Sequence, residues 1–282
     1  MGTVKTSRQT IGIVLVVISA IVFSSAGIFT RGVSTDAWDI IFWRGSAASV
    51  FTILYLVLRG DLFEEIKAFG KPAFAASMMM AAGTAAFIPA FKLSSVANVA
   101  LIYAAAPFIA AGLSWIFIKE TPTTKIILAS VAALLGVLVI VSQSLGGSQI
   151  KGDMLALFMT LMMAGMMVVY RKFPSTTAAL PAAFSSIVLL PVAFMIGTPF
   201  DVEIRELPTL VAFGLVFAIA SVTLSEGARR LPSAETALLS TLEMPLAPVL
   251  AFLILSEVPL GSTVVGGAII FLAVIWSQTP RT

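Results

Sequence analysis

The sequence predicts an all-α integral membrane protein with ten transmembrane helices in two inverted five-helix repeats. Ten apolar segments of about 17 to 24 residues fill the chain between Ile11 and Ser277. A helix needs about 20 apolar residues to cross the ~30 Å hydrocarbon core of a bilayer. The last five segments look like a degenerate copy of the first five. Because each copy has an odd number of crossings, the second copy enters the membrane upside down, an arrangement typical of secondary transporters.

The composition indicates lipid as the solvent and excludes several chemistries. Hydrophobic residues make up 59% of the 282 residues and charged residues 11%, against roughly 45–50% and about 25% in soluble domains. The chain has no His and no Cys, which removes disulfides, imidazole bases, thiolate nucleophiles and almost every zinc site. No GxxxxGK phosphate-binding loop is present. We therefore expect no enzyme activity, no metal and no cofactor, and the small basic excess does not indicate a nucleic-acid partner.

The ten segments follow one another with short connections. The first continues too far for the apolar region of a signal peptide, so we interpret it as a retained helix. The longest connection, 59–72, is charged. The predicted spans are 11–30, 37–58, 73–92, 95–118, 124–143, 153–170, 177–197, 207–228, 233–255 and 260–277.

The distribution of Lys and Arg predicts that both termini are cytoplasmic. With the N-terminus inside, the cytoplasmic segments hold 12 basic residues: Lys5, Arg8, Arg59, Lys67, Lys71, Lys119, Lys125, Arg171, Lys172, Arg229, Arg230 and Arg281. The opposite side holds 4, namely Arg31, Lys92, Lys151 and Arg205. The loops are short enough for the positive-inside rule to apply. We expect a multi-pass protein of the bacterial inner (plasma) membrane.

The duplication is visible residue by residue and divides the chain into repeats 1–145 and 146–282. A shift of 138 positions lays Leu93-Ser94-Ser95 on Leu231-Pro232-Ser233, Leu101 on Leu239, and Pro107 on Pro245. After a one-residue deletion, Glu120-Thr121-Pro122 falls on Glu257-Val258-Pro259. A shift of 140 positions lays Gly12 on Gly152 and Arg31 on Arg171.

The two equivalent prolines, Pro107 and Pro245, are expected hinges in the middle of their helices. Proline has no backbone N–H, so it frees a carbonyl one turn earlier and bends the helix. In a membrane this is tolerated where neighbours or a watery cavity satisfy the freed group. Two such bends in inverted copies would frame a central cavity at the midplane, although proline can also simply shape helix packing.

These motifs together resemble the EamA family of the drug/metabolite transporter superfamily, over the whole chain. The resemblance is carried by Phe42-Trp43-Arg44, by Ser95 through Pro107 to Glu120-Thr121-Pro122, and by Ser233 through Pro245 to Glu257-Val258-Pro259. Within the family the chain is most similar to YddG-type exporters of aromatic amino acids. The resemblance implies ten helices around one substrate cavity, and export as the direction. Phe23-Ser24-Ser25-Ala26-Gly27 departs from the Trp-Gly pair of many relatives.

Two charged residues fall at bilayer depth, where a charge costs roughly 2.5–3.5 kcal/mol and needs a reason. At 1.5 Å per residue, Arg44 and Glu243 each lie roughly 10–16 Å from their own surface, so their long side chains could meet. Glu243 is interpreted as a proton or cation site and Arg44 as a partner for a carboxylate. The alternatives are a buried structural pair, or an Arg44 side chain that reaches the outer interface.

The ninth span carries a polar stripe that supports a site. Ser233, Thr236, Ser240 and Glu243 recur at intervals of three and four, and so share one face of a helix. Asn98 in the fourth span is equivalent to Thr236. Small hydroxyl groups can equally be contacts between helices. The predicted substrate-binding residues are Asn98, Glu243, Ser240, Thr236, Tyr103, Ser24, Met163 and Arg44.

These residues bear on three function classes: a carrier, an enzyme and a channel. A carrier that exports a small organic solute by alternating access agrees with the repeat, the prolines and the sparse polar groups. Two substrate classes remain open for this carrier. One is aromatic or other large neutral amino acids, and the other is lipophilic cations exported in exchange for protons through Glu243. An enzyme would need a nucleophile–base pair, and a channel would need a filter-like loop, and the sequence offers neither. The lipid bilayer and a small-molecule substrate are the expected partners, and a monomer is compatible with the sequence.

Overall fold

A computed structural model describes residues 7–94, 96–142, 150–256 and 260–279, and these residues are helical wherever they are regular. The helices are α1 (Ser7–Phe23), α2 (Ala26–Arg31), α3 (Ala37–Arg59), α4 (Leu62–Lys67), α5 (Lys71–Leu93), α6 (Val96–Tyr103), α7 (Ala106–Ile118), α8 (Thr124–Val141), α9 (Ile150–Lys172), α10 (Ala179–Ile196), the 3-10 turn η1 (Pro199–Asp201), α11 (Leu207–Ala228), α12 (Ser233–Ser240), α13 (Glu243–Leu255) and α14 (Gly261–Gln278).

Within the described ranges, ten segments are long and apolar enough to cross a membrane, as the sequence predicted. Their bounds agree with the predicted spans to within a few residues. Three of the ten are interrupted: Ser7–Thr30 consists of α1 and α2, Asn98–Ile118 contains α7 and most of α6, and Ser233–Ile254 contains α12 and most of α13. In the fourth and ninth spans the interruptions lie beside Pro107 and Pro245, the predicted hinges, whereas no interruption was predicted in the first span.

The longest connection, 59–72, is charged, as the sequence shows, and is not entirely a loop. It contains the short helix α4, whose Phe63 is 75% exposed while Glu65 turns inward. An aromatic side chain exposed beside charged residues is typical of a segment lying at the membrane interface. The connection therefore tethers the bundle end as well as linking α3 to α5.

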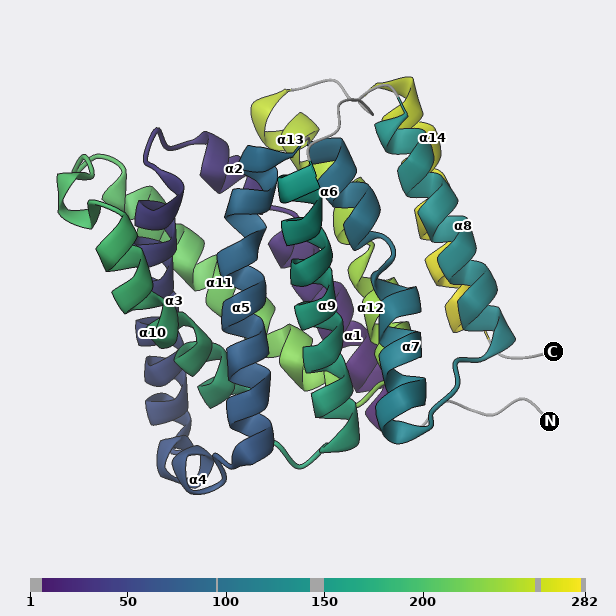
Figure 1. Cartoon of the computed structure of the whole chain (residues 1–282), viewed down its shortest axis with the longest axis horizontal. Helices are drawn as coiled ribbons and strands as arrows, with labels where there is room; N and C mark the ends of the chain where they lie inside the picture. The colour runs from purple at the N-terminus through teal and green to yellow at the C-terminus, as the bar shows by residue number, and fades with distance from the viewer. Residues whose placement is uncertain (1–6, 95, 143–149, 257–259, 280–282) are drawn as a thin grey trace.

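The helices pack in pairs that an inverted repeat relates (Figure 1). At opposite edges of the bundle, α3 packs against α10, and α8 packs against α14; each pair joins equivalent spans of the two repeats. In the centre, α5 packs against α9, and its counterpart contact is α1 against α11. This exchange of partners is what a two-fold axis in the membrane plane produces, and it buries the interior mainly with small side chains.

Two glycines equivalent in sequence make equivalent close contacts. A Cβ built on Gly12 in α1 would lie 2.9 Å from Arg230 Cβ and from Leu231 Cγ. A Cβ built on Gly152 in α9 would lie 2.4 Å from the backbone carbon of Leu93. Since Leu93 and Leu231 are themselves equivalent, the contacts support the alignment found in the sequence.

Small residues bring two helices close together at the contact between α8 and α14. A Cβ on Gly136 would lie 2.7 Å from the carbonyl oxygen of Gly266, and a Cβ on Gly266 would lie 2.3 Å from that of Gly136. Only glycine allows backbones to approach so closely. This contact is within one chain, so these glycines do not need a second copy of the protein to explain them.

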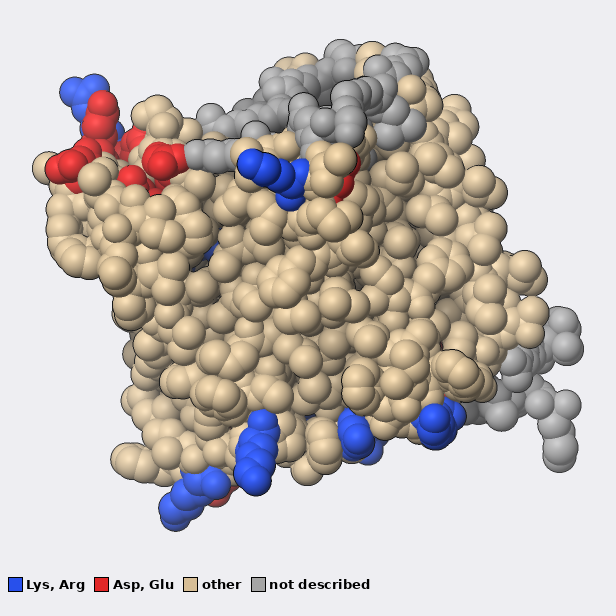
Figure 2. Space-filling model, in the orientation of Figure 1, with Lys and Arg blue, Asp and Glu red and all other residues tan. Residues whose placement is uncertain are grey.

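Charged side chains gather at the two ends of the bundle, as Figure 2 shows for one face. Lys and Arg mark the end at which α4 lies, and a group of Asp and Glu marks the other end, over the α10–α11 connection. Many large apolar side chains between the ends are exposed, among them Leu54, Leu135 and Leu272. This pattern is the one expected of a surface that faces lipid.

Candidate functional site

The first helix interruption near the middle of a span separates α6 from α7. Ala104 and Ala105 form a turn there, and Ala105 N–H donates to the Ile102 carbonyl over 3.1 Å, three residues back instead of four. Pro107 is buried in the first turn of α7, where its lack of an N–H is compatible with a helix start. The predicted hinge is therefore the place where the helix breaks and a new one begins.

The second interruption separates α12 from α13 and has the same design. Thr241 and Leu242 form the turn, and Leu242 N–H donates to the Leu239 carbonyl over 3.2 Å. Glu243 is the first residue of α13, and Pro245 is buried in its first turn. The start of a helix carries partial positive charge, so it favours the carboxylate that Glu243 places there.

The two interruptions lie at the ends of α7 and α12, which pack against each other across the interface between the repeats. Tyr103, the last residue of α6, lies close enough to Glu243 for their charges to interact. Both side chains are partly accessible although they lie deep in the protein. Among the described residues, Glu243 has no hydrogen-bond donor and no ion-pair partner, so no protein group neutralises its carboxylate. An acid in this state is available to a substrate or to a proton.

The rest of the predicted stripe on the ninth span is satisfied locally. Thr236 Oγ1 donates to the Pro232 carbonyl over 3.1 Å, and Ser240 Oγ donates to the Thr236 carbonyl over 3.0 Å. Thr236 has no accessible surface and Ser240 is 6% exposed. A substrate could reach these hydroxyl groups only after a rearrangement. In this state they donate to backbone carbonyls of their own helix and do not line a cavity.

Asn98 lies in a polar cluster whose centre the sequence did not identify as a site. Its Nδ2 donates to Asp153 Oδ1 over 3.5 Å, and Ser94 Oγ donates to the same oxygen. The cluster joins the end of α5 and the first turns of α6 and α9. Asp153 lies in the first turn of α9. Its place beside Asn98 depends on the packing of α6 against α9, which no local sequence signal reports.

Arg44 is buried within the bundle and does not reach the interface. It is 5% exposed, and its guanidinium carbon lies 4.0 Å from the ring centre of Phe217 and 5.3 Å from that of Phe213. No ion pair joins it to Glu243, and neither side chain is close enough to influence the other's charge. The predicted meeting of these two residues does not occur, because Arg44 turns toward α11 whereas Glu243 turns toward the end of α6.

Ser24 and Met163 lie in different surroundings. Ser24 is in the turn between α1 and α2, is 2% exposed and donates to the Ile21 carbonyl over 2.6 Å. Met163 lies in α9 against α5, where its methyl group would be 2.9 Å from a Cβ on Gly83. Met159, Met166 and Met167 are fully buried in the core of the bundle. Most of the Met-rich face of α9 therefore packs between helices, and half-buried Met163 lies at its margin.

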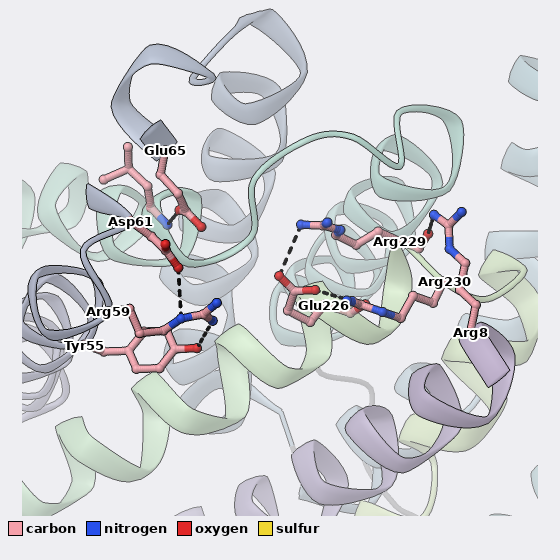
Figure 3. A network of polar contacts seen from close by, with 9 residues as sticks. Arg8, Tyr55, Arg59, Asp61, Glu65, Glu226, Arg229 and Arg230 are labelled. Carbon is pink, nitrogen blue, oxygen red and sulfur yellow. Dashed lines mark hydrogen bonds and ion pairs between the residues drawn. The ribbon is translucent and has the colours of Figure 1, made fainter. Parts of the chain in front are cut away.

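A charged network occupies the basic end of the bundle (Figure 3). Glu226 forms ion pairs with Arg229 and Arg230, three and four residues further along the chain. Nearby, Glu65 of α4 accepts the backbone N–H of Leu180 over 2.7 Å at the start of α10. Burial, with Glu226 as a smaller cause, raises the pKa of Glu65. These separate contacts join α4 to α10, and α1 to the end of α11, at the same end of the bundle.

At the opposite end of the bundle, the pKa of the Glu206 carboxyl group is lowered, whereas that of Glu65 is raised. Glu206 accepts hydrogen bonds from Thr35 Oγ1, from Ser34 N over 2.7 Å and from Ser34 Oγ over 2.8 Å. These donors lower the pKa of Glu206 to about 2. They connect the α2–α3 loop to the start of α11. Throughout the part of the chain that the structure describes, no three His, Cys, Asp or Glu side chains come together as metal ligands.

Comparison with known proteins agrees with the repeat. Residues 10–142 and, separately, residues 150–278 match the EamA-like transporter family. No curated protein matches the chain. A solved structure described only as "Crystal structure of protein" superposes with a TM-score of 0.82 at 16% sequence identity, over 96% of this chain and 97% of that one. That likeness establishes the shared fold. The chain belongs to the EamA-like transporter family and is a multi-pass membrane transporter with the ten-helix, two-repeat architecture of that family.

Proposed function

We propose that the protein exports small organic solutes, principally aromatic or other large neutral amino acids and related metabolites, across the bacterial inner membrane. The observation that carries the proposal is Glu243 at the start of α13, a partly accessible acid that has no partner among the described residues. Such an acid, deep between two inverted repeats and within electrostatic range of the Tyr103 phenol, is suited to an ammonium group attached to an apolar body.

The interruptions also supply a physical route for alternating access. Each half-helix can tilt about its turn, because the turn is held by only a few i to i−3 hydrogen bonds. The networks at the two ends connect different helices, so opening one end breaks contacts that do not constrain the other. Rocking of one repeat against the other would then expose Glu243 to each side in turn.

An exporter of lipophilic cations driven by protons is the second candidate, and Glu243 itself favours it. A carboxylate that has no cationic partner in the described part of the protein can bind either a proton or a cation, and the two would compete. In that mechanism proton entry from outside displaces the cation, whereas an amino acid carrier can run on the solute gradient alone.

The test is efflux of labelled phenylalanine from preloaded proteoliposomes with no ion gradient imposed. Saturable efflux that other large neutral amino acids inhibit is expected, and Glu243→Gln should lower its rate by about tenfold or more. Glu203→Gln, which changes an exposed acid of the α10–α11 connection, serves as the matched control. Wild-type efflux no faster than from protein-free liposomes would exclude the amino acid facilitator and favour proton-coupled cation export.

A further inference from the structure

Arg44 is a buried cation for which the described part of the protein provides no anion. It is the eighth residue of α3, which puts it about 10 Å below the end of the helix opposite to α4. Its Nε is inaccessible and has no hydrogen-bond partner, and no hydrogen bond or ion pair to its other nitrogens is present among the described residues. At 5% exposure the side chain is almost wholly buried.

The nearest acid on the same helix does not compensate this charge. Asp39 lies five positions earlier, so it is turned about 140° away around the helix axis. Its Oδ1 approaches Gly197 on the α10 side and its carboxylate accepts the Thr198 N–H, whereas Arg44 lies over rings of α11. The two charged side chains of α3 therefore contact different neighbours, and among the described residues the guanidinium has no counter-charge.

Aromatic rings hold the guanidinium instead. Phe217 and Phe213 of α11 lie beneath it, and each is extended by a ring from the first span. Phe23 contacts Phe217 edge to face at 5.8 Å between centroids, and Phe29 stacks on Phe213 at 5.3 Å. Cation–π contact orients the plane of a guanidinium but uses its face and leaves its N–H edge for a hydrogen-bond acceptor.

A cation so buried is costly unless it is paired, and cation–π contact recovers only about 0.5–2 kcal/mol. Two parallel N–H groups on the free edge match the two oxygens of a carboxylate. The surrounding rings would pack against an aromatic or branched apolar body attached to that carboxylate. The same charge repels an amine that has no carboxylate.

We propose that Arg44, held by Phe213 and Phe217, is a binding subsite for the carboxylate of the transported solute, in the half of the membrane opposite to α4. The proposal deepens the transport function proposed above and rests on it. A solute passing from Glu243 toward this half is bound first through its ammonium group and then through its carboxylate. A lipophilic cation gains nothing at the second step and is excluded by charge.

The test measures equilibrium binding to the purified full-length protein with three probes that share one ring. These are 3-phenylpropionate, which has only the carboxylate, phenethylamine, which has only the amine, and phenylalanine, which has both. The wild type should bind 3-phenylpropionate. Arg44→Gln should weaken that binding by about tenfold or more, while phenethylamine binds as well as before or better. Arg44→Lys keeps the charge without the planar edge and should be intermediate. Arg205→Gln, an exposed arginine at the same end, should change nothing.

Equal binding of 3-phenylpropionate to Arg44→Gln and Arg205→Gln, or no binding of it to the wild type, would overturn the subsite. If Arg44→Gln does not fold, the decision falls to the wild type's preference for 3-phenylpropionate over phenethylamine and to Phe217→Leu, which should weaken carboxylate binding. Arg44-dependent binding of 3-phenylpropionate without phenylalanine efflux leaves the subsite standing and rejects amino acid export. Phenylalanine efflux that Arg44→Gln leaves unchanged supports amino acid export and rejects the Arg44 subsite.

Discussion

The two helix interruptions share a backbone design but differ in chemistry. Both consist of a two-residue turn followed by a helix with a buried proline in its first turn. At the position of Glu243 in the second repeat, the first repeat has Ala105. Duplication therefore supplied two bends, and only one of them acquired a charge. The bends determine where the repeats can move, whereas the single acid determines what can be bound there.

The largest effect is expected from removing this difference. Glu243→Gln keeps the shape of the side chain and should lower transport by about tenfold or more, because it removes the only charge at the interruption. If protons are coupled, the pH dependence of transport should disappear with it. Initial rates in proteoliposomes between pH 6 and pH 8 provide the measurement. A mutant with the wild-type rate and pH profile would show that Glu243 has no part in the mechanism.

The prolines allow the common part of the design to be tested. Pro107→Ala and Pro245→Ala each restore a backbone N–H, so the carbonyls of Tyr103 and Thr241 can regain a donor four residues on and the helix can straighten. We expect transport to slow by about threefold to tenfold while substrate binding changes less. Pro245→Ala should be the more severe, since it also moves Glu243. Equal rates in both mutants and the wild type would mean that the bends only shape packing.

The equivalent glycines compare the two repeats in stability rather than activity. At Gly152 an added methyl group would collide with the backbone of Leu93, which cannot move without shifting the α5–α6 junction. At Gly12 it would meet side-chain atoms of Arg230 and Leu231, which have some freedom. Gly152→Ala should therefore cost about 1–3 kcal/mol, and Gly12→Ala less. Thermal unfolding of both mutants in the same detergent tests the order, which a larger loss at Gly12 would reverse.

The smallest expected effect is on the pH dependence of stability, through Glu206 and Glu65 at the two ends of the bundle. The pKa of Glu206 is lowered to about 2 by Thr35 and Ser34, so its contribution is fully present above about pH 4.3, its ordinary unfolded value, and is lost as the pH falls toward 2. The pKa of Glu65 is raised, so its contribution has the opposite sign and falls as the pH rises. Glu206→Gln should lower the melting temperature at pH 7 by more than at pH 4.

Glu203→Gln is the control for this last comparison, because Glu203 is an exposed acid of the same connection. A constant difference in melting temperature between the wild type and Glu206→Gln across this pH range would contradict the assigned hydrogen bonds. Glu65→Gln, at the other end, should show its benefit at the higher pH.

The sequence predicted only part of the candidate site, and particular residues show why. Glu243 and Pro245 were found because a charge and a proline inside an apolar segment are conspicuous along the chain. The partnership of Asn98 with Asp153 and of Glu243 with Tyr103 was not found, since the partners lie 55 and 140 positions apart. The possible pairing of Arg44 with Glu243 does not form in the structure, because depth in the membrane says nothing about direction around the bundle axis.

The sequence by itself determined that the chain crosses a membrane ten times, that it consists of two repeats, and where the fourth and ninth spans bend. These properties depend on local physics: the length of an apolar run, the missing N–H of proline, and the small size of glycine. Only the tertiary structure decided which polar groups meet. Rotation of each helix about its axis is set by packing against all its neighbours at once. That rotation brought Arg44 over Phe217 and left its N–H edge without a partner among the described residues.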